Sequence, residues 1–191
     1  MKKVFILIFC FGSVVGSHAQ PGKLQGKTDR LAEGMEQKVI EWRRIIHASP
    51  ELSYEEFQTA ARVAAHLEAL GMEVKTNVAK TGVVGVLKGG SPGPVIALRA
   101  DMDALPVEER NNLPFASNVK TTFNGQETGV MYACGHDAHV AILMGVAEIL
   151  ARNRNDLAGT VKFIFQPAEE GKQGEDSGAD KMVKEGVLEN P

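Results

Sequence analysis

Three short clusters of ionisable side chains have the composition of a metal site. The first cluster is residues 134–139, with the sequence CGHDAH, which holds a thiol, two imidazoles and a carboxylate. The second is the pair Asp101 and Asp103, and the third is the pair Glu169 and Glu170. Thiolate, imidazole and carboxylate groups are the ligands of zinc and similar divalent ions. Because crowding such groups costs free energy without a partner, we expect a metal ion here.

Each cluster by itself also has a simpler interpretation. An Asp-x-Asp sequence after a strand is more often a solvated turn, and paired glutamates are more often surface charge. The Cys-Gly-His sequence could be a buried thiol beside a helix-capping histidine. The metal interpretation gains weight because all three clusters follow predicted buried strands or loops, where α/β folds build their sites. Cys134 and His136 are one residue apart, so both side chains would point the same way in an extended segment.

The two adjacent glutamates could have different roles. One of them can bind the metal ion while the other takes a proton from a metal-activated water. This chemistry hydrolyses an amide or ester. Two alternatives remain open at this point: a Cys134 nucleophile activated by His136 or His139, and a non-catalytic, truncated metal-binding domain.

The elements that must position these clusters alternate between helix and strand. Apolar residues recur at helical spacing in four segments, at 29–47, 53–70, 139–154 and 179–186. Short apolar or alternating runs predict four strands, at 72–78, 83–87, 95–98 and 160–165. Ser53 and Glu56 fit a capping box at the start of the second helix. Residues 89–94 predict a turn, and 110–128 a loop that could include a short hairpin. The order predicts an α/β layer architecture with a largely parallel or mixed sheet.

Composition narrows the function classes. The 191 residues are 43% hydrophobic and 24% charged, which is typical of one ordinary globular domain. The net charge of -3, with both signs interspersed, gives no electrostatic case for a nucleic acid partner or an anionic membrane surface.

The first residues have the order of a secretory signal peptide. Lys2 and Lys3 precede an apolar run, and small residues end the segment at Ala19. We therefore expect cleavage of residues 1–19 and a periplasmic or secreted protein, with no membrane association after cleavage. Residues 20–28 predict a flexible lead. Removal of the signal leaves Cys134 as the only cysteine, which adds interest to its cluster.

Four motifs together resemble one known family. The chain is similar to the metal-dependent amidohydrolases and metallopeptidases that cleave N-acyl amino acids, the family of hippurate hydrolase, aminoacylase and indoleacetyl-amino-acid hydrolase. The motifs are RRIIH followed by PEL at 43–52, LRADMDALP at 98–106, YACGHDAH at 132–139 and FQPAEEG at 165–171. They occur in the family's order and cover nearly all of residues 30–186.

The resemblance implies a role for each candidate residue. It implies three metal ligands: Cys134, His136 and Glu170. It implies that Glu169 is the catalytic general acid and base. It also implies three supporting residues around the ligands: Asp103, Asp137 and His139.

The resemblance further implies a three-layer α/β/α aminopeptidase-like catalytic domain with a mixed, mostly parallel sheet and two divalent metal ions, Mn²⁺ or Zn²⁺. Family members are about twice as long and carry an inserted lid domain that forms homodimers. Residues 29–191 would be the N-terminal part of the catalytic domain, truncated before that lid. No histidine follows His139, so we expect an incomplete site and no activity from this chain alone. The implied substrate is a small N-acyl amino acid or peptide.

Overall fold

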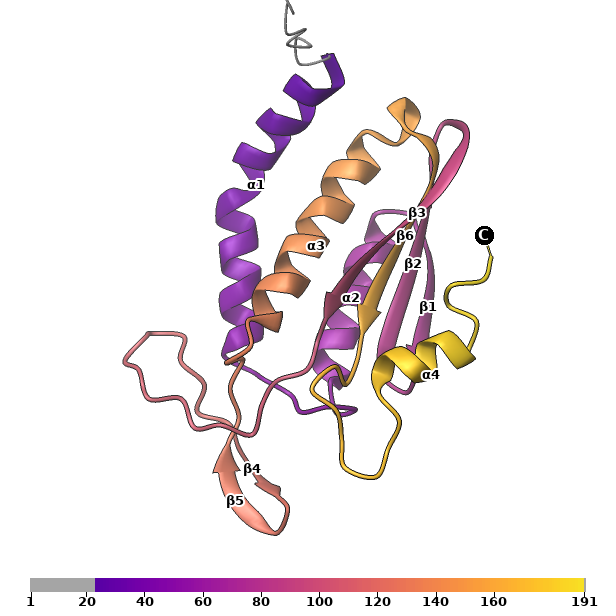
Figure 1. Ribbon diagram of the computed structural model, residues 1–191. Helices are drawn as coiled ribbons and strands as arrows, with labels where there is room; N and C mark the ends of the chain where they lie inside the picture. The colour runs from indigo at the N-terminus through magenta and orange to yellow at the C-terminus, as the bar shows by residue number, and fades with distance from the viewer. Residues whose placement is uncertain (1–22, 191) are drawn as a thin grey trace, which may run out of the picture.

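A four-stranded mixed sheet organises the computed structural model, which describes residues 23–190 (Figure 1). The strands, in the order β1-β2-β6-β3, span Glu73–Val78, Gly82–Lys88, Ala158–Gln166 and Ser91–Asp101. Strand β3 pairs with β6 in parallel, whereas β1 with β2 and β2 with β6 are antiparallel. The predicted α/β class and mixed sheet are confirmed. The expectation that most pairs are parallel is wrong for the described strands, because the short connection 79–81 joins β1 to β2 as a hairpin and a parallel pair needs a longer crossover.

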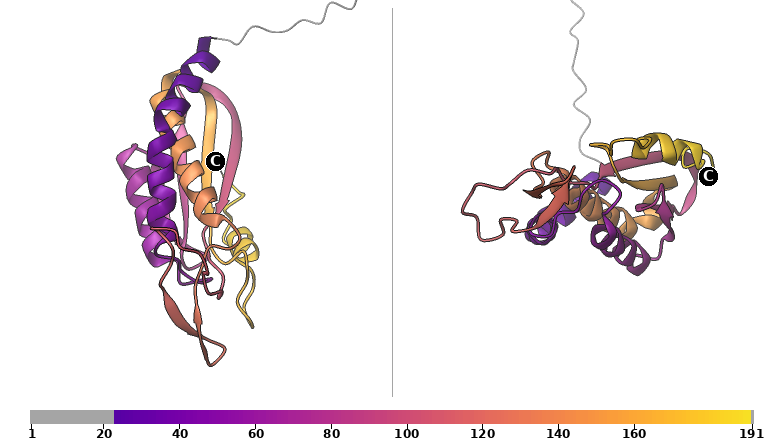
Figure 2. Two further views of the ribbon diagram at one scale, coloured as in Figure 1. Left: turned by 90° about the vertical axis from the view of Figure 1, so that its left-hand side faces the viewer. Right: turned by 90° about the horizontal axis from the view of Figure 1, so that it is seen from below.

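Helices lie on both faces of the sheet. Helices α1 (Lys23–His47), α2 (Phe57–Ala69) and α3 (His136–Arg152) lie on one side, with α1 packed against α3. The short helix α4 (Gly178–Lys184) covers the opposite face, as the view from below shows (Figure 2). A short turn of helix, Arg154–Asp156, leads into β6. The arrangement is the three-layer α/β/α order that the resemblance implies.

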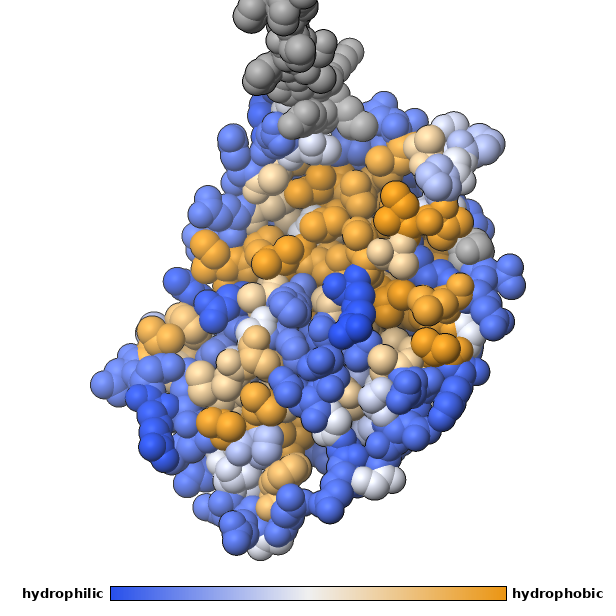
Figure 3. Space-filling view, in the orientation of Figure 1, coloured by the Kyte–Doolittle hydropathy of each residue, from blue (hydrophilic) through white to orange (hydrophobic). Residues whose placement is uncertain are grey.

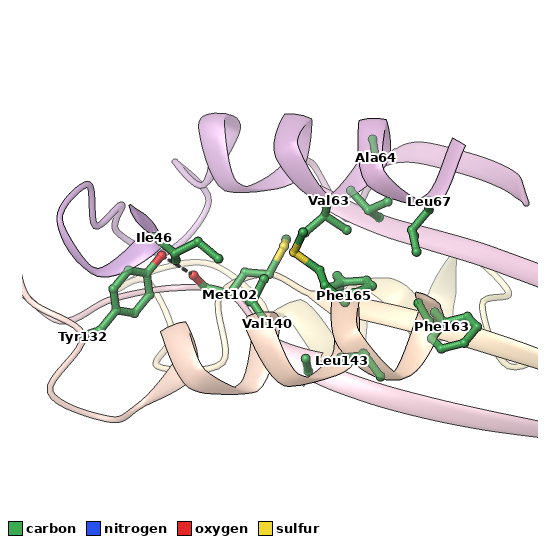
Figure 4. Packing of buried hydrophobic residues seen from close by; sticks show 14 of the residues in the cluster. Ile46, Val63, Ala64, Leu67, Met102, Tyr132, Val140, Leu143, Phe163 and Phe165 are labelled. Carbon is green, nitrogen blue, oxygen red and sulfur yellow. Dashed lines mark hydrogen bonds between the residues drawn. The ribbon is translucent and has the colours of Figure 1, made fainter. Parts of the chain in front are cut away.

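Two hydrophobic cores lie between these layers. Figure 4 shows the larger one, in which side chains of α2 and α3 meet those of β6. Its fully buried members include Val63, Leu67, Val140, Phe163 and Phe165. The smaller core lies under α4 and includes Ile164 and Met182. Neighbouring residues of β6 thus face opposite layers, which explains why the consecutive residues Phe163, Ile164 and Phe165 are all apolar and buried.

Helix α1 begins earlier than the sequence predicts. The helix starts at Lys23, so residues 23–28 are helical and the prediction of a flexible lead is wrong there. A single glycine at Gly26 costs a helix only about 1 kcal/mol. In addition, the Lys27 ammonium lies 2.9 Å from the Asp156 carboxylate. The rest of the lead and the predicted signal peptide lie outside the described residues.

The capping box predicted for α2 is also wrong. Helix α2 begins at Phe57, and no side chain of its N-cap residue binds the helix end. Instead the Glu51 carboxylate accepts hydrogen bonds from the backbone N–H of Gln58 and Thr59, at 2.8 and 2.9 Å. At the other end, Gly71 has a φ of +70°, the left-handed conformation that commonly follows the last residue of a helix. The hydroxyl of Ser53 is therefore free for another partner.

Strand β3 and the loop after it also differ in extent from the prediction. The strand begins at Ser91, so part of the expected turn 89–94 is strand, and its prolines are tolerated because β3 lies at the sheet edge. The loop region 110–128 contains the hairpin of β4 (Lys120–Phe123) and β5 (Gln126–Gly129). Its turn is Asn124-Gly125, both with positive φ, as two-residue hairpin turns require.

A hydrophobic surface lies along α3 and the edge strand β3. The exposed fractions of Val95, Ile96 and Ile142 are 48%, 55% and 56%. Figure 3 shows hydrophobic side chains gathered over this side of the molecule. Within residues 23–190, no helix has both the length and the apolar character needed to cross a membrane.

Candidate metal centre

The candidate site lies where β3 and β6 end together. These strands are parallel and their last residues, Asp101 and Gln166, are register partners. The backbone N–H of Met102 donates to the carbonyl of Gln166 at 2.9 Å, which keeps the two chains together beyond the strands. Segments 102–103 and 167–170 therefore leave the sheet side by side. Asp103 contacts His136, so the start of helix α3 also lies beside these segments.

The structure brings the three predicted metal ligands together. Ligand atoms of Cys134, His136 and Glu170 all lie within 4.8 Å of one another. Ligands of a tetrahedral zinc ion lie roughly 3.5 Å apart, so small side-chain movements would bring these atoms onto one ion. The thiol is half-buried, the imidazole is buried and the carboxylate is exposed. The donor set and its spacing fit a divalent metal ion.

Asp103 orients the imidazole of His136. The Nδ1–H of His136 donates to the backbone carbonyl of Asp103 at 2.8 Å, and Nδ1 lies 3.4 Å from the Asp103 carboxylate. Since Nδ1 is used in this way, Nε2 remains as the ligand atom. Burial by itself would lower the pKa of His136, but the Asp103 carboxylate and the Cys134 sulfur raise that pKa to about 11 in the metal-free chain.

The Asp103 carboxylate also holds the backbone that carries the two glutamates. It is fully buried and accepts hydrogen bonds from the N–H of Glu169 and Glu170, at 3.0 and 2.9 Å. The hydroxyl of Ser53 donates to it at 2.7 Å. Burial would raise the pKa of Asp103, but hydrogen bonds from His136, Ser53 and the two backbone groups hold that pKa below its usual value. Asp103 therefore remains ionised and supports both halves of the site.

Glu169 lies beside the ligands, with its carboxylate next to the ring of His136. Its Oε2 lies 3.7 Å from Nε2 of His136, the atom left for a metal ion. The Glu169 side chain is 41% exposed, so water reaches it. The arrangement suits the predicted general acid and base, and that role stays a prediction.

Asp137 and His139 make different contacts near the site. Asp137 is fully buried, and its Oδ2 accepts hydrogen bonds from Arg43 and His47 of α1, at 2.9 and 2.8 Å. Its carboxylate thus fixes the start of α3 against α1. The ring of His139 lies 5.4 Å from the ring of His136 and is half exposed. Both support roles therefore remain predictions, with Asp137 acting through the helix and His139 through a ring contact.

A second group of potential ligands shares His136. Ligand atoms of Asp101, His136 and His139 also lie within 4.8 Å of one another. However, the guanidinium of Arg99 binds the Asp101 carboxylate, with Nη2 2.7 Å from Oδ1. A fixed positive charge there opposes the binding of a metal ion. The group that contains Cys134 is therefore the better candidate centre.

The local geometry of the CGHDAH cluster differs from the prediction. Cys134 and His136 do not lie in an extended segment, because Gly135 has a φ of +89° and is the N-cap of α3. This left-handed conformation favours glycine. The chain turns at Gly135, and His136 belongs to the first turn of the helix. The two ligand side chains still converge, but they do so around a helix start.

Sequence reasoning missed two groups that hold the site. His47 was given no role, yet it is buried and contacts both Asp137 and Glu109. Ser53 was interpreted as a helix cap, yet it binds Asp103. The sequence signals are the place of His47 in a family motif and the position of Ser53 directly after that motif, because the partners lie 50 or more residues away.

Fold and site together define the class of protein. A three-layer α/β fold that gathers thiolate, imidazole and carboxylate groups at the ends of neighbouring parallel strands is typical of metal-dependent hydrolases. Residues 97–191 match peptidase family M20/M25/M40 and belong to a domain of this family.

The names of similar proteins agree with this assignment. The chain is 44% identical over 160 residues to the N-acyl-L-amino acid amidohydrolase of Geobacillus stearothermophilus, covering 84% of this chain and 40% of that protein. It is 45% identical over 170 residues to the IAA-amino acid hydrolase ILR1-like 2 of Arabidopsis thaliana, covering 87% and 36%. The chain thus spans about two fifths of the length of these relatives.

A solved structure shows the same fold. The Bacillus subtilis YXEP protein, described as a dinuclear metal binding peptidase from the M20 family, superposes with a TM-score of 0.71 at 44% identity. The match covers 82% of this chain and 41% of that one. The resemblance stated from the motifs is therefore confirmed, as is the fold class.

Proposed function

We propose that this chain forms part of the catalytic domain of a metal-dependent amidohydrolase that cleaves the amide bond of N-acyl amino acids or small peptides. The observation that carries the proposal is the convergence of Cys134, His136 and Glu170, with the Glu169 carboxylate beside them. The named activities of the relatives support the same reaction class.

The chain's own residues divide the work of the reaction. A bound divalent ion supplies Lewis acidity, which polarises an amide carbonyl and makes water more nucleophilic near neutral pH. Glu169 takes a proton from the attacking water and returns it to the leaving amine. Asp103 holds His136 in the tautomer whose Nε2 is free, and the same carboxylate fixes the backbone of Glu169 and Glu170.

The cofactor and partners of the whole protein are part of this proposal. We propose two divalent ions, the number that the dinuclear relative's description implies, with further ligands from sequence outside residues 23–190. We propose Mn²⁺ or Zn²⁺ as these ions. A homodimer formed through a lid domain and export directed by residues 1–19 belong to the same proposal. By itself, the 191-residue chain is then inactive.

A cavity next to Glu170 suits the acyl group of the substrate. It has a volume of about 580 Å³ and lies between the β4–β5 hairpin and the loop after Glu170. Its walls include four apolar side chains: Leu52, Leu105, Pro106 and Phe123. The one lysine that lines it, Lys172, is paired with Glu55 at 3.2 Å. The cavity therefore favours a neutral, apolar group over a carboxylate.

Chelation tests the proposal. We expect the full-length protein to lose hydrolysis of an N-acyl amino acid on treatment with a chelator and to regain it with Mn²⁺ or Zn²⁺. Turnover that is insensitive to chelation would contradict a metal mechanism and favour a Cys134 nucleophile. Stoichiometric metal together with a thiol protected from alkylation would exclude the nucleophile, whereas Cys134→Ser separates the two only partly because serine is also a poor ligand.

A further inference from the structure

The turn at residues 167–170 is held almost entirely through its backbone. The N–H of Ala168 donates to the Glu56 carboxylate at 2.9 Å, and the Ala168 carbonyl accepts from Gly178 at 3.2 Å. The next two N–H groups, of Glu169 and Glu170, donate to Asp103. Two buried carboxylates therefore hold consecutive residues of the segment that carries the candidate ligand and the general base.

The conformation of this turn needs such support. Ala168 has a φ of +47°, a left-handed conformation that L-residues with a Cβ seldom adopt. Such strain persists only where the surroundings hold it in place. On one side, Gly178 packs so closely that a Cβ there would lie 1.6 Å from the carbonyl oxygen of Pro167. The Glu56 carboxylate holds the Ala168 N–H.

Glu56 is an unusual group to find at this depth. Its side chain is fully buried, and its second oxygen accepts a hydrogen bond from the Thr81 hydroxyl. Burial raises the pKa of Glu56, although the bonds from Thr81 and Ala168 act in the opposite direction. Neither partner carries a charge, so burial of this carboxyl costs free energy that an apolar residue would not cost. A role in holding the turn accounts for its presence.

We propose that Glu56 is a positioning residue for the metal centre, which acts on Glu169 and Glu170 through the backbone of Ala168. The inference rests on the proposed function, because it assigns Glu56 a place in that site. Glu56 precedes α2, whereas the turn follows β6, so the contact joins the second helix to the reacting carboxylates. Loss of the contact frees Ala168 to leave its left-handed conformation and moves Glu170 away from Cys134 and His136.

Metal affinity of the full-length protein tests this proposal. The probe is Co²⁺, whose thiolate charge-transfer absorption reports the bond to Cys134 and whose titration gives the affinity. We expect Glu56→Ala to weaken Co²⁺ binding about tenfold or more, the usual effect of losing a group that orients ligands. Glu56→Gln keeps an oxygen for Ala168 and an amide for Thr81, so its affinity should stay within about twofold of the wild type.

A matched control separates positioning from general loss of stability. Val63→Ala removes buried methyl groups from α2, the helix that Glu56 precedes, without touching the turn. This variant should leave Co²⁺ affinity and the absorption band unchanged. If Glu56→Ala does not fold, Thr81→Val removes the bond that fixes the Glu56 carboxylate and should weaken binding in the same direction.

Three results would overturn the inference. The first is unchanged Co²⁺ affinity in Glu56→Ala, or in Thr81→Val if Glu56→Ala does not fold. The others are equal losses of affinity in Glu56→Gln and Glu56→Ala, and a loss in Val63→Ala equal to that in Glu56→Ala. Failure of the wild type to bind Co²⁺ through Cys134 would instead contradict the proposed function, and this inference with it.

Discussion

Nδ1 of His47 lies 2.8 Å from Oδ2 of Asp137, and both side chains are buried. On the other side of the ring, Nε2 lies 3.0 Å from the Glu109 carboxylate. Each ring nitrogen of His47 therefore faces a carboxylate, one from α3 and one from the loop after β3. His47 ends α1, and Asp137 lies in the first turn of α3, where the helix dipole favours a negative charge. The pair ties the C-terminus of α1 to the residue that follows His136.

We expect His47→Ala to destabilise the protein strongly. The substitution leaves the buried carboxylates of Asp137 and Glu109 without their shared partner, which typically costs about 3 kcal/mol or more. Urea unfolding would measure the loss. The matched control is Arg44→Ala at the same helix end, where the contact with the Phe115 ring is lost, at a cost of about 1 kcal/mol or less. Equal effects of the two substitutions would contradict the interpretation.

Acid should weaken the same network. Burial by itself would raise the pKa of Glu109, but hydrogen bonds from His47, Ser117 and Asn111 lower it below the usual 4.5. A carboxylate with a lowered pKa in the folded state stabilises the protein above its unfolded pKa, and this contribution is lost as the pH falls through the folded pKa. We therefore expect the free energy of unfolding to decrease as the pH falls below about 4.5. Glu109→Gln should reduce that slope, and an unchanged slope would count against the assignment.

Metal binding should release protons and strengthen as the pH rises. Although burial opposes the charged imidazole, Asp103 and Cys134 raise the pKa of His136 to about 11, so the metal-free ring is protonated near neutral pH. A ligand imidazole must be neutral, so metal binding displaces a proton from the ring. For each proton displaced, the apparent metal affinity should rise about tenfold per pH unit. Calorimetry in buffers of different ionisation enthalpy would count the protons. Metal affinity that stays constant between about pH 6 and 8, the range in which an ordinary histidine titrates, would refute this prediction.

Substitutions of the two adjacent glutamates should have different effects. Glu169→Gln should keep metal binding but lower the turnover of the full-length enzyme about 10²- to 10⁴-fold, the usual contribution of general acid–base catalysis. Glu170→Gln should instead weaken metal binding, because Glu170 lies with Cys134 and His136. Metal content and steady-state kinetics of both variants distinguish the roles. An exchange of the two phenotypes would reverse the assignment.

The 191-residue chain by itself should self-associate. Val95, Ile96 and Ile142 expose a hydrophobic surface along the β3 edge and α3, and unpaired edge strands of this kind promote association. Light scattering after size-exclusion chromatography would detect the oligomers. Ile142→Glu should reduce them, whereas Phe57→Glu, at an exposed residue of α2, should not. A monodisperse wild-type monomer would contradict the expectation.

Local patterns in the sequence determined much of the site. The residue types in CGHDAH and in the Glu169-Glu170 pair indicated a metal centre, and the apolar residues of segment 160–165 predicted the strand β6. The short hairpin that loop 110–128 could include is also present, with its turn at Asn124-Gly125. These features depend on neighbouring residues, and neighbours in sequence are what periodicity and turn chemistry report.

Only the tertiary structure decided which partner each polar side chain takes. Ser53 binds Asp103 across 50 residues, His47 binds Asp137 across 90, and the Glu56 carboxylate binds the N–H of Ala168 across 112. Local patterning assigned Ser53 and Glu56 to a helix cap, because their spacing fits one. Burial overrode that preference, since a carboxylate inside the fold must find a donor wherever the packed chain brings one. The sequence by itself therefore determined the chemistry of the centre, and the packing of distant segments determined the geometry that holds it.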